Sequence, residues 1–310
     1  AMFSGCALLD DKNLLGKNDG NNKCALLFYT TTNPFCQQMS YSVDNFKSII
    51  PYGEKPVVPH IMEANRDTKV IFCDEIGCYI MVLYLTKDNY CIFKSDDLIE
   101  WEEIQQMQIQ GDNECPDIFP LCDSEGNRKW IIMGAHEKYL VGKFEDGKFV
   151  AEQSVLPLHY GTSAYAGQSF SNLPCGRIVR MVWDRWGLPT FNFKGQMGIP
   201  MEMSLSKYKE TYYLEANPVK EIENIYKTTK IYNNVNITAE AMFKENLMCS
   251  AQLIKIKSEF IEKGNLTISV FGRSINFDFG QNKINIGDCA APVSLTDSGY
   301  NNSLTSLFLK

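Results

Sequence analysis

The sequence predicts an all-β protein assembled from repeated antiparallel units. Short runs rich in β-branched and aromatic residues recur along the chain, and Leu27, Met81, Ile132 and Met181 mark them at steps of 54, 51 and 49 residues. We find no long stretch with the periodicity of an amphipathic helix. A four-strand unit that repeats every ~40–50 residues is typical of the blades of a β-propeller. A β-sandwich with coincidental spacing is the alternative interpretation.

Each repeat continues in the same order. The marked run is followed by a second strand-like run and then by a turn-rich segment, and the phrase that begins at Ser42 is echoed 53 residues later at Ser95. Clusters of turn residues, such as those between Asp123 and Asn127, separate the runs. Four units are visible. In a propeller the first strands of all units surround one channel, so residues at the starts of these strands converge on one mouth of that channel.

The pattern changes near Tyr212. A charged stretch over 220–230 is followed by strand-like runs around 242–243, 253–256, 266–271 and 275–279, with turns at Gly272 and Gly280. This arrangement predicts an antiparallel β-sandwich. We therefore expect a propeller domain over 1–211 and a sandwich domain over 212–310. The run over 304–309 reads as a late strand whose partners are missing, which predicts an incomplete sandwich.

The amino-acid composition argues against several classes of binding partner and cofactor. The 310 residues carry a net charge of −7 and contain no cluster of Lys and Arg, which argues against nucleic acid and anionic membrane surfaces. The eleven cysteines include no C-x-x-C pair, and there are three histidines, so we expect neither a metal site nor a cofactor. Buried reduced thiols and the lack of a visible signal peptide favour a cytoplasmic location.

Two carboxylates precede the first apolar runs of successive repeats. Asp67 follows Arg66 and Glu114 precedes Cys115, and each acid stands just before an apolar run. Their places should bring the two acids together although they are 47 residues apart. Paired carboxylates are the minimum equipment for cleaving a glycosidic bond. The structural alternatives are an Arg66–Asp67 ion pair and a loop acid at Glu114 that caps a strand.

The sequence motifs around these acids are more specific than the pairing of two carboxylates. Phe3-Ser4-Gly5, Arg66-Asp67 and Glu114-Cys115-Pro116-Asp117, in this order, resemble glycoside hydrolase family 32. The resemblance implies a five-bladed propeller followed by a β-sandwich, and a retaining β-fructosidase that acts on sucrose or fructans. The family's nucleophilic aspartate stands in an Asn-Asp-Pro-Asn motif on the first blade. That motif lies upstream of this chain, so we expect weak or absent hydrolysis, and self-association through the exposed blade faces.

The resemblance also implies roles for single residues. Glu114 would be the general acid and base, with a pKa raised toward neutrality. Asp67, with Arg66, would stabilise the transition state. The remaining candidates for substrate binding are Phe3, Ser4, Cys115, Gln168 and Trp183. The sequence departs from the family's usual residues at Thr68, His159, Ser163, Ala164 and Met201.

Two other functions fit the sequence. A propeller without turnover could still bind fructosyl units through Arg66, Asp67 and Glu114. A further alternative is a five-bladed glycosidase that acts on arabinan or xylan, since such enzymes use three carboxylates as fructosidases do. The motifs at Arg66 and Glu114 resemble those of fructosidases more closely.

Overall fold

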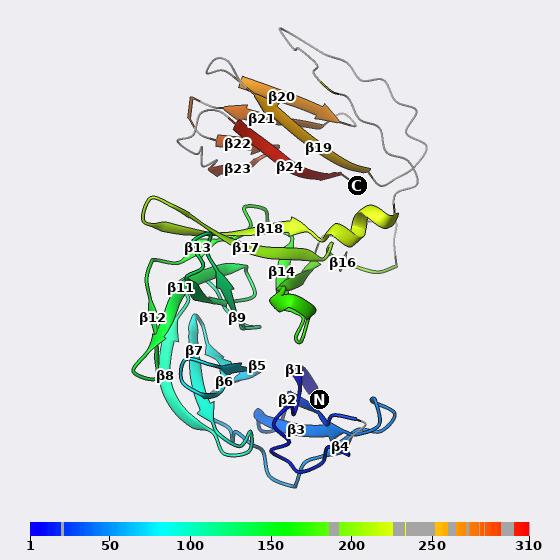
Figure 1. Ribbon diagram of the computed structural model, residues 1–310, viewed down its shortest axis with the longest axis vertical. Coiled ribbons are helices and arrows are strands. Elements are labelled where there is room, and N and C mark those ends of the chain that lie inside the picture. Colours follow the sequence, from blue (N-terminus) through cyan, green and yellow to red (C-terminus); the bar gives the residue numbers. More distant parts are fainter. Residues whose placement is uncertain are drawn as a thin grey trace. The chain divides into compact units, whose positions relative to one another are not determined.

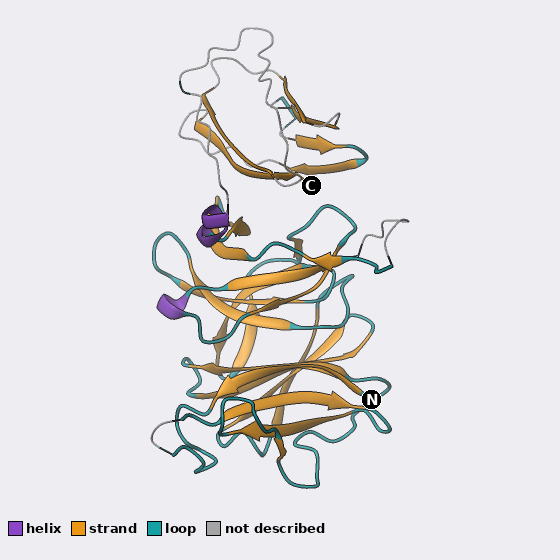
Figure 2. Cartoon of the chain, turned by 90° about the vertical axis from the view of Figure 1, so that its right-hand side faces the viewer, coloured by secondary structure: helices purple, strands orange, loops and turns teal. Residues whose placement is uncertain are grey.

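The computed structural model describes residues 1–19, 22–185, 192–225, 233, 252–259, 265–270, 273–278, 280–281, 283–292 and 301–309. These ranges are built of strands and two short 3-10 helices, η1 (Pro174–Gly176) and η2 (Lys220–Ile225) (Figure 2). The predicted all-β class is confirmed. None of the helices in the described ranges is long and apolar enough to cross a membrane. The chain divides into two compact units, Ala1–Ala216 and Asn217–Lys310.

The first unit contains four antiparallel sheets that follow one another in chain order (Figure 1). The first sheet contains β1 (Met2–Leu9), β2 (Ala25–Thr31), β3 (Cys36–Ser42) and β4 (Ile50–Pro51). The second contains β5 (Arg66–Cys73), β6 (Cys78–Thr86), β7 (Asn89–Ser95) and β8 (Glu102–Gln108). The third contains β9 (Asp117–Cys122), β10 (Arg128–Met133), β11 (Lys138–Glu145), β12 (Lys148–Ala151) and β13 (Leu156–Pro157). The fourth contains β14 (Ala164–Ser169), β15 (Val179–Asp184), β16 (Gln196–Met197), β17 (Met201–Tyr208) and β18 (Thr211–Pro218).

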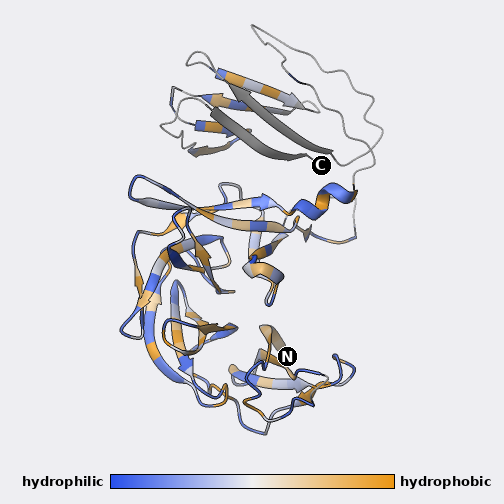
Figure 3. Ribbon diagram, viewed as in Figure 1, coloured by the Kyte–Doolittle hydropathy of each residue, from blue (hydrophilic) through white to orange (hydrophobic). Residues whose placement is uncertain are grey.

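The sheets pack face to face, and each interface holds its own apolar core. Alternate side chains of β6 serve two cores, because successive residues of a strand point to opposite faces. Ile80 and Val82 face the third sheet, while Met81 and Leu83 face the first. Strands buried on both faces read as continuous apolar runs, which explains the repeat seen in the sequence. The outer strand β8 is mostly hydrophilic (Figure 3).

The first strands of three of the four sheets are bulged. The pairing register shifts between Met2 and Gly5 in β1, between Arg66 and Lys69 in β5, and between Tyr165 and Gln168 in β14. Such β-bulges bend a strand and redirect its side chains. Strands β1, β5, β9 and β14 contact one another in succession, so the three bulged strands and β9 lie side by side.

A buried ion pair ties three of these strands together. The Lys69 ammonium on β5 lies 3.2 Å from a carboxylate oxygen of Asp117 on β9, and both side chains are almost completely buried. Asp117 also accepts hydrogen bonds from the amide and hydroxyl of Ser169 on β14, both at 2.8 Å. Burial raises the pKa of Asp117, but the Lys69 and Arg180 cations lower it more, and the net pKa lies below its ordinary value.

The last strand of the fourth sheet lies beyond residue 210. β18 runs to Pro218 as a strand of the fourth sheet, because Tyr212 and Leu214 are buried in the core shared with the third sheet. The second unit pairs β19 (Gln252–Glu259) with β24 (Asn301–Leu309). It also contains a sheet of β20 (Asn265–Val270), β21 (Arg273–Asp278), β22 (Lys283–Ile286) and β23 (Cys289–Pro292). The predicted run at 242–243 lies outside the described residues. The blade count and the sandwich stay predictions.

The Asp117→Asn variant tests the buried ion pair. We expect it to lose about 3–5 kcal/mol of unfolding free energy at neutral pH, because it leaves the buried Lys69 charge unpaired. The folded-state pKa of Asp117 is depressed, so its stabilising contribution is complete above the unfolded-state pKa and is lost as the pH falls through the folded-state pKa. Urea denaturation at neutral and acidic pH measures both effects.

The matched control is Glu202→Gln. Glu202 pairs with Arg177 at 2.8 Å in the fourth sheet, but both side chains are partly exposed. Pairs of this kind contribute roughly 0–1 kcal/mol. Equal losses in Asp117→Asn and Glu202→Gln would contradict the assignment of a special role to the buried pair.

Candidate active site

One guanidinium joins the two acids singled out from the sequence. Arg66 donates a hydrogen bond through Nη2 to Oε1 of Glu114, and its Nε lies 3.6 Å from Oδ2 of Asp67. Its Nη1 donates to the carbonyl of Ala64 at 2.7 Å, and its head lies 4.9 Å from the centre of the Tyr84 ring. Two carboxylates 47 residues apart in sequence therefore meet at one cation. The predicted convergence of these side chains is present in the structure.

Glu114 is held as a carboxylate. The hydroxyl of Tyr165 donates to its Oε2, and Arg66 occupies its Oε1. Burial raises the pKa of Glu114, but the hydrogen bonds from Tyr165 and Arg66 outweigh burial, so the net pKa lies below its ordinary value. The sequence analysis expected a pKa raised toward neutrality. That expectation is wrong for the protein alone, because the donors on both oxygens stabilise the charged form.

Asp67 has the opposite environment. Its side chain is 6% exposed, and the amide of Cys115 donates to Oδ2 at 3.1 Å. Burial raises its pKa, and the hydrogen bonds from Cys115 and the charge of Arg66 offset only part of that rise. The Cys115 thiol lies 3.5 Å from the same oxygen, so Cys115 contacts Asp67 directly. Asp67 has a left-handed φ of 64°, and its own amide donates to the hydroxyl of Thr30 at 3.0 Å.

An aromatic group surrounds the hydroxyl that binds Glu114. Tyr165 has its ring centre 5.0 Å from that of His136 and 6.3 Å from that of Trp183, and the Arg185 guanidinium lies 3.7 Å from the ring centre. Trp183 is 42% exposed, so one face of this group is open to solvent. Trp183 was a candidate from the sequence. Tyr165 was quoted only as part of a motif, and nothing in the sequence indicated Arg185 or His136.

The contacts described for the remaining candidates Gln168 and Phe3 are with residues other than Glu114 and Asp67. The amide group of Gln168 donates to the carbonyls of Cys115 and Pro116 at 3.2 and 3.1 Å, so it links β14 to the Glu114 segment. Phe3 stacks on Phe35 with ring centres 5.7 Å apart. Ser4 stands with Phe3 in the β1 bulge.

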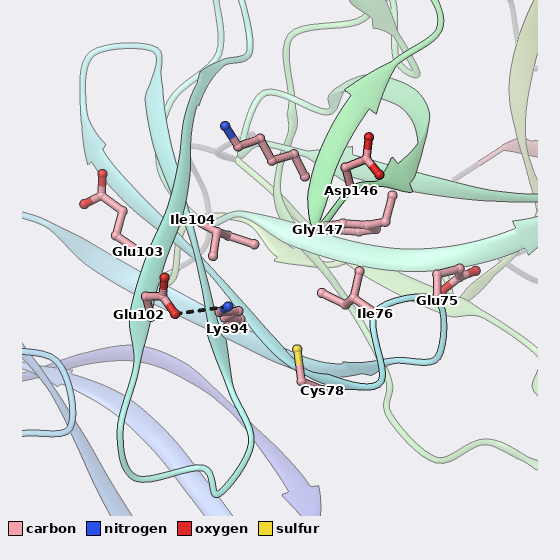
Figure 4. Close-up of a pocket in the computed structure, with 11 residues that line it drawn as sticks. Glu75, Ile76, Cys78, Lys94, Glu102, Glu103, Ile104, Asp146 and Gly147 are labelled. Atoms are coloured by element: carbon pink, nitrogen blue, oxygen red, sulfur yellow. Dashed lines mark ion pairs between the residues drawn. The ribbon is translucent and has the colours of Figure 1, made fainter.

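Two hollows lie outside this constellation. The larger, of about 560 Å³, lies between the second and third sheets and holds the Lys94–Glu102 ion pair at 3.0 Å (Figure 4). The second, of about 390 Å³, runs between residues 5–9 and 168–172 and is bordered by the exposed rings of Phe46 and Phe170. Neither contains Glu114 or Asp67 in its lining. Among the described residues, no three His, Cys, Asp or Glu side chains are grouped as a metal would need.

Comparison with known proteins identifies the family of the chain. The family model "Glycosyl hydrolases family 32 N-terminal domain" matches residues 1–218. A levanase of Bacillus subtilis is 29% identical over 268 residues, which cover 76% of this chain and 39% of the levanase. The chain thus spans well under half the length of that relative.

Solved structures agree at the level of the fold. An exo-inulinase from Aspergillus awamori superposes with a TM-score of 0.73 at 18% identity, over 96% of this chain and 73% of that chain. A β-fructofuranosidase from Schwanniomyces occidentalis, complexed with fructosyl-erythritol, gives a TM-score of 0.67 at 19% identity, over 99% of this chain and 72% of that chain. Members of the matched family hydrolyse O-glycosyl bonds. Because the family match covers more than half of the sequence, the chain belongs to glycosyl hydrolase family 32, through the N-terminal domain of that family.

Proposed function

We propose that this chain carries the acid–base half of a β-fructosidase site, with Glu114 as the general acid and base and Asp67 as the stabiliser of the transition state. The observation that supports this most directly is the meeting of both carboxylates at Arg66. The family match supports glycosidic hydrolysis as the reaction. Retaining glycosidases need an acid and a nucleophile on either side of the bond that is cut.

The two carboxylates suit different tasks. Asp67 is buried and receives donors from Cys115, so it can bind fructosyl hydroxyls in a fixed orientation. Glu114 is partly exposed and can exchange protons with substrate and water. Before it can protonate a leaving oxygen, Glu114 must first take up a proton. A further negative charge beside it, such as a nucleophilic carboxylate, would raise its pKa and favour that step.

We propose sucrose or a fructan as the substrate. The B. subtilis relative is named a levanase, and the S. occidentalis structure is a β-fructofuranosidase with a fructosyl ligand. The Asn-Asp-Pro-Asn motif that the resemblance requires for the nucleophile does not occur in these 310 residues. We therefore propose that these residues by themselves turn over such sugars weakly or not at all. The five-bladed propeller, the β-sandwich and self-association belong to the same proposal.

A second candidate is a sugar-binding module without turnover. The depressed pKa of Glu114 favours it, because a permanent carboxylate beside Arg66 is a good acceptor for sugar hydroxyls and a poor acid. Hydrolysis and binding assays separate the two functions.

The first experiment measures hydrolysis of sucrose, inulin and levan by the 310-residue chain. We expect rates far below the ~1–10³ per second of ordinary enzymes. The residual rate should fall further in Glu114→Gln, because the amide cannot donate or accept the proton. Glu102→Gln is the control, since Glu102 is an exposed acid on β8 that pairs with Lys94 on β7.

The outcomes are distinct. Ordinary turnover that disappears in Glu114→Gln would contradict weak turnover and would reveal a nucleophile within the chain. Binding of fructose oligomers by calorimetry, with no hydrolysis in either protein, would favour the binding module. A chain that neither binds nor hydrolyses these sugars would contradict both functions.

Tyr165→Phe tests the electrostatic description of Glu114. The variant removes a donor to the carboxylate, so we expect the pKa of Glu114 to rise and its carboxylate to take up a proton at higher pH. The ¹³C shift of the Glu114 carboxyl, assigned with Glu114→Gln and followed through a pH titration, measures this pKa. Tyr29→Phe, which loses a hydroxyl that contacts Ser40, is the control. An unchanged pKa in Tyr165→Phe would refute the description.

A further inference from the structure

The bulge in β14 is held by charged side chains rather than by its sheet. Between Tyr165 and Gln168 the ladder with β15 shifts register, which leaves Ala166 and Gly167 without regular partners. The amide of Gly167 donates to Oε1 of Glu137 at 2.9 Å, and its carbonyl accepts from Nη2 of Arg180 at 2.8 Å. Both backbone groups of the bulged residue are therefore bound by one acid and one base.

Glu137 and Arg180 form a buried pair. Arg180 Nη1 lies 2.5 Å from Oε2 of Glu137, and the side chains are 2% and 0% exposed for Arg180 and Glu137. Arg180 also contacts Asp117 through Nε at 2.9 Å, and His159 lies 3.9 Å from Glu137. A well-packed apolar pair is often as stable as a buried ion pair. Stability alone therefore does not account for two charges at this position.

The space around Gly167 is tight. A Cβ built on it would lie 2.5 Å from Oε1 of Glu137 and 2.8 Å from Nη2 of Arg180. The preceding residue, Ala166, has a left-handed φ of 51°, and its amide donates to the carbonyl of Ala135 at 2.8 Å. These contacts restrict the backbone of the bulge directly after Tyr165, whose hydroxyl donates to Glu114.

We propose that Glu137 and Arg180 are positioning residues for Glu114: their ion pair fixes the β14 bulge, and the bulge holds the Tyr165 hydroxyl on the Glu114 carboxylate. The side chain of Glu114 binds Arg66 and Tyr165, whereas Glu137 and Arg180 bind one another. The importance of this arrangement for catalysis rests on the proposed role of Glu114 as the acid.

A positioning role and a direct electrostatic effect of Glu137 predict opposite changes in the pKa of Glu114 when the charge of Glu137 is removed. The charged and titratable groups that face Glu114 are Arg66, Asp67, Tyr84, Cys115, His136 and Tyr165. If Glu137 acted on Glu114 through space, removal of its negative charge would lower the pKa of Glu114. If it acts by holding Tyr165, its removal weakens a donor to the carboxylate, and the pKa of Glu114 rises.

The test is a double-variant cycle read by the Glu114 ¹³C titration. We expect Glu137→Gln to raise the pKa of Glu114 in the same direction as Tyr165→Phe. We expect the combination of the two to add little to Tyr165→Phe alone, because both changes act through one hydrogen bond. Glu202→Gln is the matched control: it makes the same chemical change to an arginine-bound acid of the fourth sheet, on β17.

Gly167→Ala provides an independent arm, because it disturbs the same contact and removes no charge. We expect it to raise the pKa of Glu114 as well, and it carries the test if Glu137→Gln does not fold. A fall in the pKa, no change, or additive effects in the combined variant would overturn the proposal. The titration needs no turnover, so a chain that fails to hydrolyse fructans can still support or refute the positioning role.

Discussion

Four buried charges must neutralise one another for the first unit to fold as it does. Lys69 on β5, Asp117 on β9, Glu137 before β11 and Arg180 on β15 form a chain of contacts that crosses three sheets. An unpaired charge at such a depth would cost several kcal/mol, so the four side chains select one relative placement of the strands that carry them. Apolar cores between sheets favour close packing but tolerate sliding. The charges supply the register that the cores lack.

The candidate site lies on irregular backbone of the strands and loops that these charges hold in place. Asp67, Glu114 and Ala166 all have left-handed φ values, between 51° and 64°. Such conformations cost free energy in residues with a side chain and persist only where surrounding contacts impose them. Here the contacts are Thr30 and Cys115 at Asp67, and the neighbourhood of Glu137 and Arg180 at Ala166. A regular ladder would send alternate side chains to opposite faces of each sheet, whereas the bulges turn successive ones toward the same few atoms.

The sequence predicted the parts of this arrangement that depend on local pattern. Runs such as Trp130–Met133 are apolar throughout because both faces of β10 are buried, and this makes the repeat visible without coordinates. The meeting of Asp67 and Glu114 followed from their positions before the first apolar runs of successive repeats. The ion pair of Glu137 with Arg180 did not, because the partners are 43 residues apart and an isolated Glu or Arg in a strand-rich segment reads as a surface residue. The direction of the Glu114 pKa was missed for the same reason, since it depends on Tyr165, 51 residues away.

The surroundings of the two carboxylates shift their pKa values in opposite directions. These shifts decide which further group the acid role of Glu114 requires. Burial makes Asp67 the harder acid to ionise, while Arg66 and Tyr165 keep Glu114 charged. Proton donation to a leaving oxygen requires the reverse order. Both acids share Arg66, so a negative charge or a ligand that draws the guanidinium toward itself weakens the hold on Glu114 and raises its pKa. Besides direct repulsion, Arg66 therefore gives a further charge at this site a second way to convert Glu114 from an acceptor into an acid.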